Sequence, residues 1–524
     1  MRRAENDDGA YVRIGTAQAQ TVTARETSVG GAYGGAGLLW RWALLFAASL
    51  LLFWPGLRAG YFSDDLLFFF NSPPAHWYDY FAIRGAAAQA YRPLEAIILS
   101  SIQRHFWFET LPIHLLSLLA HTGLCCIVLA AGLRLGMSVV ERWIACTFML
   151  VTQVAAPAVL GNDTLSQSVS AFFGGLSAFF LYFGWRDQQA GTRRISKAWL
   201  SFSVLAYTIG LFFKETALGF LLVVLLLIGI IALEESTWAA RIKRAISLSL
   251  PYGAATLLYA GARLHAGGAV SQSGSYRIHV GMNIVKNIVE FTLAAFGPMS
   301  TVDGAVAVEM HRTPELILGG LGWAFITALI VAGGLLSRRG ALIGWLLAAA
   351  MASLFPAYLL THVSELYLYN AIPFLALILG IAFGALWRRG RWGRLVAVLC
   401  AGLLIGGQVY ANRQKAELMA SNGRRAAIIY ASIDHYLHTM PPDSRILLVN
   451  PPNRTPEYSV FLLKGFDIVD LGNLRIGPIF GRPDVRVELM EEPQARALES
   501  RKNQLLISLD AGGDLRPYHT PGNR

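Results

Sequence analysis

Two adjacent carboxylates, Asp64 and Asp65, follow the first long apolar run of the chain, within segment 60–71. One interpretation is a helix N-cap followed by a first-turn acid, because both stabilise the free N–H groups of a helix start. The other is a general base, with the second carboxylate orienting it or holding a metal. Like charges near a low-dielectric medium raise at least one pKa, which suits proton transfer near neutral pH. Because adjacent residues point in different directions on a helix, we expect separate roles for the two aspartates.

A basic residue with phosphate-binding chemistry follows in the sequence Tyr91-Arg92-Pro93. An arginine here can extend its charged end from an apolar surface into water. Its fork of donors can also bind a phosphate. Proline suits the first turn of a helix, so Pro93 would place Arg92 at a helix entrance, where anions are favoured.

Further charged residues stand between apolar runs. Lys214 and Glu215 occupy one short junction, and Arg263 ends another run. Such a pair can simply keep a tight turn in water. It can also supply a cation for a phosphate and an acid for a hydroxyl group.

Histidines mark two other places. His114 and His121 are seven residues apart, which puts them on one face of a helix. Histidines inside apolar helices are usually buried and hydrogen-bonded, and a substrate-binding role is the alternative. His362 and Glu365 stand in a short turn, followed by aromatic residues that are typical of membrane interfaces.

The composition indicates an all-α polytopic membrane protein. The 524 residues are 54% hydrophobic and only 15% charged, and the mean hydropathy is +0.46. A soluble domain has about 25% charged residues. The net charge of +11 does not indicate nucleic-acid binding, because the basic residues fall in short loops where membrane orientation explains them. All four cysteines lie in apolar runs, which excludes a disulfide framework.

About eleven apolar runs are long enough to span a bilayer. We place them at 38–57, 112–132, 143–160, 168–185, 198–213, 216–233, 245–262, 316–336, 341–360, 367–387 and 395–411. They form a transmembrane domain over 38–411, preceded by a disordered cytoplasmic segment 1–37 and followed by an extracytoplasmic region 412–524.

Lys and Arg concentrate in alternate loops, which would be cytoplasmic if the N-terminus is inside. The candidate residues then share the outer face. Segment 94–108 in the first outer loop and segment 282–296 have the amphipathic spacing of interfacial helices. Short apolar runs at 445–449, 458–463, 466–471 and 504–509 predict strands of a small α/β region.

Taken together, these motifs resemble the GT-C superfamily of membrane glycosyltransferases, especially the bacterial group related to protein O-mannosyltransferases and aminoarabinose transferases. The resemblance rests on Phe62 to Asp65, on Tyr91 to Leu94, on Ile113 to His121, on Phe213 to Glu215 and on Ser364 to Tyr369. It covers residues 38–411.

The resemblance implies a sugar donor carried on a polyprenyl phosphate, an inverting transfer to a hydroxyl of a glycan, lipid or protein, and a site at the outer face of the inner membrane. Asp64 or Asp65 would be the base, and Arg92, Lys214 or Arg263 would bind the phosphate. The substrate-binding residues would be Tyr91, His114, His121, Glu215, His362 and Glu365. A divalent cation is not required, but an oxygen-only acidic site would favour Mg²⁺ or Mn²⁺ over Zn²⁺.

Other functions remain open. A transporter or flippase would place ionisable residues near the membrane midplane, whereas the predicted span centres are nearly free of charge. An envelope scaffold and another lipid-linked polysaccharide enzyme, such as a ligase or polymerase, are further alternatives.

Overall fold

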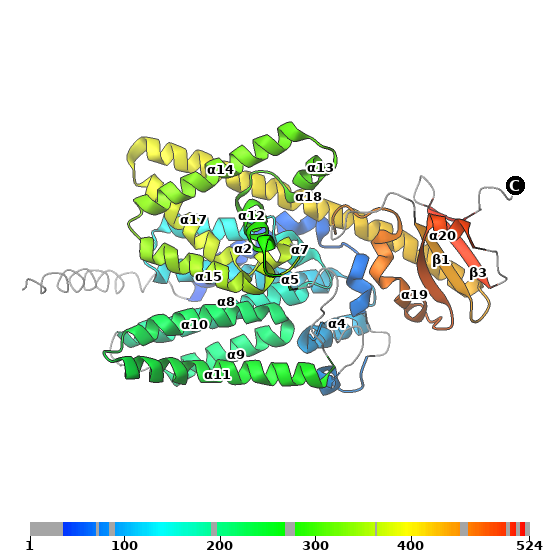
Figure 1. Cartoon of the computed structure of the whole chain (residues 1–524), viewed down its shortest axis with the longest axis horizontal. Coiled ribbons are helices and arrows are strands. Elements are labelled where there is room, and N and C mark those ends of the chain that lie inside the picture. Colours follow the sequence, from blue (N-terminus) through cyan, green and yellow to red (C-terminus); the bar gives the residue numbers. More distant parts are fainter. Residues whose placement is uncertain are drawn as a thin grey trace, which may run out of the picture. The chain divides into compact units, whose positions relative to one another are not determined.

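The computed structural model describes most of the chain (Figure 1). The described residues are 35–69, 73–82, 90–189, 196–267, 278–361, 364–450, 460–498, 503–509 and 514–518. His362 and most of the segment predicted to be disordered lie outside them. The chain divides into two compact units, residues 1–48 and 49–524. The site described below belongs to the second.

A helix forms over each run that the sequence predicts to span the membrane. These helices are α2 (Gly35–Phe53), α5 (Leu111–Arg134), α6 (Val139–Val151) with α7 (Ala155–Leu160), α8 (Leu165–Gln189), α9 (Lys197–Phe213), α10 (Leu218–Leu233), α11 (Trp238–His265), α14 (Thr313–Leu336), α15 (Gly340–Tyr358), α17 (Ile372–Trp387) and α18 (Gly390–Thr439). Within the described residues, six helices are long and apolar enough to cross a membrane, and three apolar helices are shorter. The protein is therefore an integral membrane protein, and the count of eleven spans stays a prediction.

The predicted run 143–160 is interrupted, because α6 ends at Val151 and α7 begins at Ala155. Buried side chains of α18 bind the backbone at this interruption. Asn412 donates from Nδ2 to the carbonyl oxygen of Thr152 over 2.8 Å, and Gln408 accepts from the backbone N–H of Gln153 over 2.8 Å. These bonds satisfy groups that a continuous helix would have paired internally.

Helix α18 is 50 residues long, and Figure 1 shows it as one continuous ribbon. The boundary predicted at residue 412 therefore falls inside a helix. A sheet of order β2-β1-β3-β4 follows. Strand β1 (Arg445–Asn450) pairs in parallel with β2 (Arg486–Glu491) and β3 (Gln504–Leu509), while β4 (Leu515–Pro517) is antiparallel to β3.

Two of the four predicted strands, at 445–449 and 504–509, are confirmed. The prediction for 466–471 is wrong, because this segment is the 3-10 helix η7 (Gly465–Gly472). Its buried side chains Phe466, Ile468 and Val469 do not alternate as strand residues do. Asn450 also binds the start of the turn, accepting from Phe466 N and donating to Asp467 Oδ1. The described part of 458–463 contains no strand.

Four segments carry the candidate site. They are the 3-10 helix η3 (Ser63–Phe68), helix α4 (Pro93–Phe106), the turn 161–164 between α7 and α8, and the 3-10 helix η5 (Glu215–Ala217). The helices predicted at 94–108 and 282–296 are present as α4 and α12 (Met282–Phe296). Pro93 occupies the first position of α4, with Arg92 as its N-cap, as the sequence predicts.

Candidate active site

Asp65 fixes the turn that carries both adjacent carboxylates. Its Oδ2 accepts hydrogen bonds from Phe62 N at 2.9 Å and from Asn162 Nδ2 at 2.8 Å, and its Oδ1 accepts one from Asp163 N at 3.2 Å. The capping interpretation is thus correct for Asp65. Both of its oxygens are used to join η3 to the turn 161–164.

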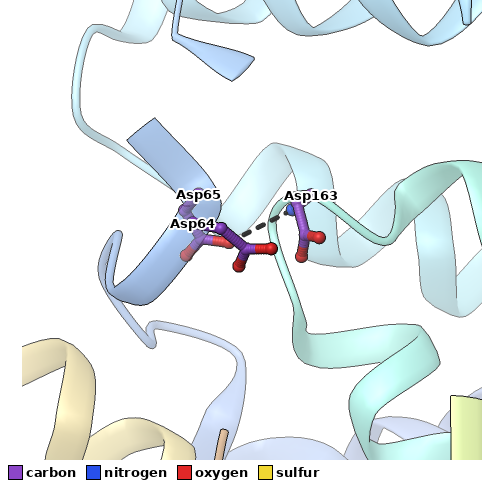
Figure 2. A group of neighbouring side chains, drawn as sticks. All are labelled: Asp64, Asp65 and Asp163. Carbon is purple, nitrogen blue, oxygen red and sulfur yellow. Dashed lines mark hydrogen bonds between the residues drawn. The ribbon is translucent and has the colours of Figure 1, made fainter. Parts of the chain in front are cut away.

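Asp64 is in a different environment. Its carboxylate lies beside those of Asp65 and Asp163, with one oxygen of each within 4.8 Å of the others (Figure 2). No other residue in the described ranges donates a hydrogen bond to the Asp64 carboxylate. Burial, reinforced by the negative charge of Asp163, raises the pKa of Asp64 to about 7. The pKa of Asp65 is also raised, chiefly by burial and then by Asp163 and Asp64. A carboxylate with the pKa of Asp64 can take up a proton near neutral pH, and Asp64, unlike Asp65, is not committed to hydrogen bonds with other described residues.

Asp163 is not among the site residues predicted from the sequence. In the sequence, Asp163 is only a charged residue in a short turn between two apolar runs, and many solvent-exposed turns share this pattern. Its position beside Asp64 depends on the fold, because Asp65 binds its backbone N–H across 98 residues.

Arg92 lies beside this acidic group but is already paired. Its Nε is 3.5 Å from Glu215 Oε2, and its Nη1 is 3.5 Å from Glu95 Oε2. Nη1 also donates to Ser166 Oγ at 3.4 Å and to Asp163 O at 3.5 Å. Burial alone would lower the pKa of Arg92, but Glu215 and Glu95 raise it above its ordinary value. Arg92 is a permanent cation held by two carboxylates.

Glu95 is a further residue that the sequence analysis missed. It is fully buried, and its Oε1 accepts from Ser166 N at 2.8 Å. Burial raises its pKa, although the charge of Arg92 opposes this shift. Glu95 thus ties α4 to the start of α8 and orients Arg92.

Lys214 is the second cation and has no such partner. It is only 3% exposed, and its side chain makes no hydrogen bond with any residue that the structure describes. Burial, followed by repulsion from Arg92, lowers its pKa to about 8. The positive charges of Arg92 and Lys214 both act on Asp64, so a base and two cations are close neighbours. A buried ammonium without a hydrogen-bond acceptor is suited to binding an anion.

Two other predicted residues are connected to this group through Tyr259. Arg263 donates to Tyr259 Oη at 3.4 Å, and Tyr259 Oη donates to the carbonyl oxygen of Tyr91 at 3.3 Å. Tyr91 donates its own hydroxyl to Phe81 O at 3.1 Å. Its described contacts are those of a packed aromatic residue.

The two predicted histidines are buried within α5. His121 is satisfied on both nitrogens, by Tyr369 Oη at 2.8 Å and Leu150 O at 3.1 Å. Because the Leu150 carbonyl can only accept, Nε2 carries the proton and Nδ1 accepts from Tyr369. His114 Nδ1 contacts Leu57 O at 2.8 Å, while its buried Nε2 has no partner in the described part of the chain. These contacts are those of core histidines.

Glu365 belongs to a separate buried network. Lys415 Nζ lies 2.7 Å from its Oε2 and also donates to Gln153 Oε1 at 3.0 Å. Thr301 Oγ1 donates to Glu365 Oε2 at 2.8 Å. Among the described contacts, none links Glu365 to the acidic group on η3.

The three carboxylates of Asp64, Asp65 and Asp163 could hold a metal ion. Because Asp65 already uses both oxygens, Asp64 and Asp163 would supply the free ligands. An oxygen-only donor set fits Mg²⁺ or Mn²⁺.

No protein-family profile and no curated protein matches the chain. Among solved structures, ArnT from Cupriavidus metallidurans in the apo state is similar at 12% identity and a TM-score of 0.49, over 86% of this chain and 85% of that one. ArnT from the same organism bound to undecaprenyl phosphate is similar at 12% identity and a TM-score of 0.47, over 89% and 93%.

A third similar structure is the oligosaccharyltransferase AglB from Archaeoglobus fulgidus in complex with an inhibitory peptide and a dolichol-phosphate. Its identity is 12% and its TM-score 0.46, over 86% of this chain and 64% of that one. Because these TM-scores are below 0.5, the function proposed below depends on the side chains of this chain.

Proposed function

We propose that this protein is an inverting glycosyltransferase that moves a sugar from a polyprenyl-phosphate donor to a hydroxyl acceptor at the outer face of the membrane. One observation carries the proposal. The Asp64 carboxylate, which receives no hydrogen bond from another described residue and has a pKa of about 7, feels the positive charge of Lys214, a buried lysine whose side chain forms no hydrogen bond or ion pair with another described residue. A base for a hydroxyl and a cation for a phosphate are what such a transfer needs.

In this reaction the acceptor oxygen attacks the anomeric carbon of the sugar from the side opposite the phosphate. The new carbon–oxygen bond forms as the bond to the phosphate oxygen breaks, through an oxocarbenium-like transition state, which inverts the anomeric configuration. Asp64 takes the acceptor proton. Lys214 stabilises the negative charge that develops on the departing polyprenyl phosphate, and Arg92 adds to the positive field.

Mg²⁺ or Mn²⁺ would be held by Asp163 and by one oxygen of Asp64, which leaves the other oxygen of Asp64 for the acceptor proton, and it would supply a Lewis acid on the acceptor side of the reaction. The donor set supports this assignment because it offers only carboxylate oxygens. Direct measurement of Mn²⁺ binding to the purified protein tests it, with Asp163→Asn expected to weaken binding.

We further propose that the protein lies in the inner membrane with a cytoplasmic N-terminus and an extracytoplasmic C-terminus. The distribution of Lys and Arg supports this orientation. Single cysteines replacing the exposed residues Glu109 and Arg391 should be labelled by an impermeant reagent from opposite sides in a background without native cysteines. Labelling of both from the same side would contradict the orientation.

The activity is tested by comparing Asp64→Asn with the wild-type protein in a strain that lacks the chromosomal copy. Asp64→Asn should insert normally and lose the glycan change that wild-type protein restores. Glu109→Gln is the matched control, because this acid is exposed and has no side-chain hydrogen bond in the described ranges. Restoration by Asp64→Asn as efficient as by wild type would rule out Asp64 as the base.

A further inference from the structure

A residue of the C-terminal region reaches the turn that carries the acidic group. Arg475, in α19 (Asn473–Ile479), donates from Nη1 to the carbonyl oxygen of Leu67 at the end of η3. Its side chain is partly buried, and burial lowers its pKa. Within the described residues Arg475 forms no ion pair. A cation at the carbonyl end of a helical turn is electrostatically favourable, so this contact stabilises the turn from its C-terminal side.

The next carbonyl of the same turn is held from another direction. Gln103 of α4 donates from Nε2 to Phe68 O at 3.3 Å. Two side chains, Arg475 and Gln103, therefore bind consecutive carbonyl oxygens of η3. Since η3 has only six residues, few hydrogen bonds of its own define the direction in which Asp64 points.

Aromatic rings connect the same two regions. Tyr61 and Phe69 flank η3, and their ring centroids are 5.5 Å apart. Phe69 packs on Phe108 at 5.0 Å, and Phe108 stacks on Phe480 of the C-terminal region at 5.7 Å. These contacts pack aromatic rings against both ends of the turn.

We propose that Arg475 is a positioning residue for the acidic turn, so that the C-terminal region acts in transfer by fixing Asp64 in place. The proposal rests on the proposed function where it concerns transfer, but the contact between Arg475 and η3 can be tested without it. No described hydrogen bond or ion pair joins Arg475 to the acidic group, so Arg475 acts through the backbone of η3.

The test compares Arg475→Met, Arg475→Lys and wild type as full-length protein in detergent. Methionine keeps an apolar stem and removes the donor, whereas lysine restores one donor. Amide hydrogen exchange over residues 61–69 should be about tenfold or more faster in Arg475→Met, as expected for loss of a charge-assisted hydrogen bond. Arg475→Lys should recover much of the protection. Exchange in β1 should be unchanged if the sheet is intact.

Arg486→Met is the control, because this arginine is exposed on β2 of the same region and its side chain has no described partner. Unchanged exchange at 61–69 in Arg475→Met would overturn the proposal. So would equally accelerated exchange in β1 that lysine does not rescue, because Arg475 would then only stabilise its own domain.

The second measurement compares ligand affinity and glycan transfer in the same variants. Affinity for undecaprenyl phosphate, used as a probe of the phosphate site, should not change in Arg475→Met, because Lys214 and Arg92 are retained. Glycan transfer should fall at least tenfold and be rescued by lysine. If amide exchange at 61–69 is faster in Arg475→Met but Asp64→Asn still transfers the sugar, the proposed function is wrong. The contact between Arg475 and η3 would still stand. Normal transfer by Arg475→Met with a loosened turn would show that Arg475 does not position the base.

Discussion

The side-chain amide of Asn162 donates a 2.8 Å hydrogen bond to Asp65 across 97 residues of sequence. This bond, with two from backbone N–H groups, gives Asp65 a structural task that its neighbour does not share. The two adjacent aspartates therefore divide between them the roles that the sequence leaves open. Asp65 builds the turn, which leaves the Asp64 carboxylate for the proposed proton transfer.

This division predicts that two matched substitutions differ in their effect on stability. Asp65→Asn replaces a carboxyl group that accepts three hydrogen bonds and should lower the free energy of unfolding by about 1–3 kcal/mol. Asp64→Asn should not destabilise the protein.

The pKa of Asp64 is raised in the folded state to about 7, so the folded state binds this proton more tightly than the unfolded state. Wild-type stability should thus fall as pH rises from about 4 to 7, and Asp64→Asn should lack this part of the decline. Thermal unfolding in detergent at several pH values measures both effects. Equal losses in both variants would contradict the division.

The rate of transfer should rise with pH through about 7, because Asp64 must be deprotonated to accept a proton. A divalent cation bound by Asp64 and Asp163 would favour the ionised carboxylates and move this limb of the profile to lower pH. The pH profile of transfer in membranes, recorded with Mg²⁺ and with a chelator, tests this. If the transfer rate with the chelator present rises already below pH 5, the pKa of the base is not raised.

Lys214 should carry most of the phosphate affinity, because Arg92 is neutralised by Glu95 and Glu215. We expect Lys214→Met to weaken binding of undecaprenyl phosphate about 10- to 100-fold. Binding by the wild type should decline above pH 8, where the pKa of Lys214 allows the ammonium to lose its proton. Lys197→Met, at the exposed start of the same helix α9, is the control. Similar affinities for the two variants would assign the phosphate to other residues.

Much of the fold could be predicted from the sequence, because long apolar runs have few alternatives in a membrane. Helices form over all of the predicted spans. The interruption after Val151 could not be predicted, because its hydrogen bonds come from Gln408 and Asn412, more than 250 residues away. Strand β2 was also missed, since its sequence Arg486–Glu491 alternates with charged residues and lacks a continuous apolar run.

For the candidate site, the sequence indicated the residue types but not their partners. Asp64, Arg92, Lys214 and Glu215 do lie together. Asp163 and Glu95 were missed because single acids in short turns or in an amphipathic helix carry no distinctive signal. The pairing of Glu365 with Lys415 was hidden for another reason: Lys415 lies beyond the predicted end of the last span, in a stretch interpreted as a separate region.

The buried pair of Lys415 and Glu365 leads to a last prediction. Lys415 is fully buried and the side chain of Glu365 is 15% exposed, so Lys415→Met would leave a largely buried carboxylate without its counter-charge. We expect this to cost about 3–5 kcal/mol of unfolding free energy. The double variant with Glu365→Gln should lose less than the sum of the two single losses, because it removes both charges.

Arg413 forms an ion pair with Glu417 on the exposed face of the same helix, which makes Arg413→Ala the control, with a cost of about 0.5 kcal/mol or less. Denaturant unfolding in detergent measures the free energy of unfolding of each variant in this double-mutant cycle. If Lys415→Met were no more harmful than Arg413→Ala, the pair would not be structural. Reduced affinity of Glu365→Gln for undecaprenyl phosphate, with stability unchanged, would return Glu365 to the substrate-binding role that the sequence motif implies.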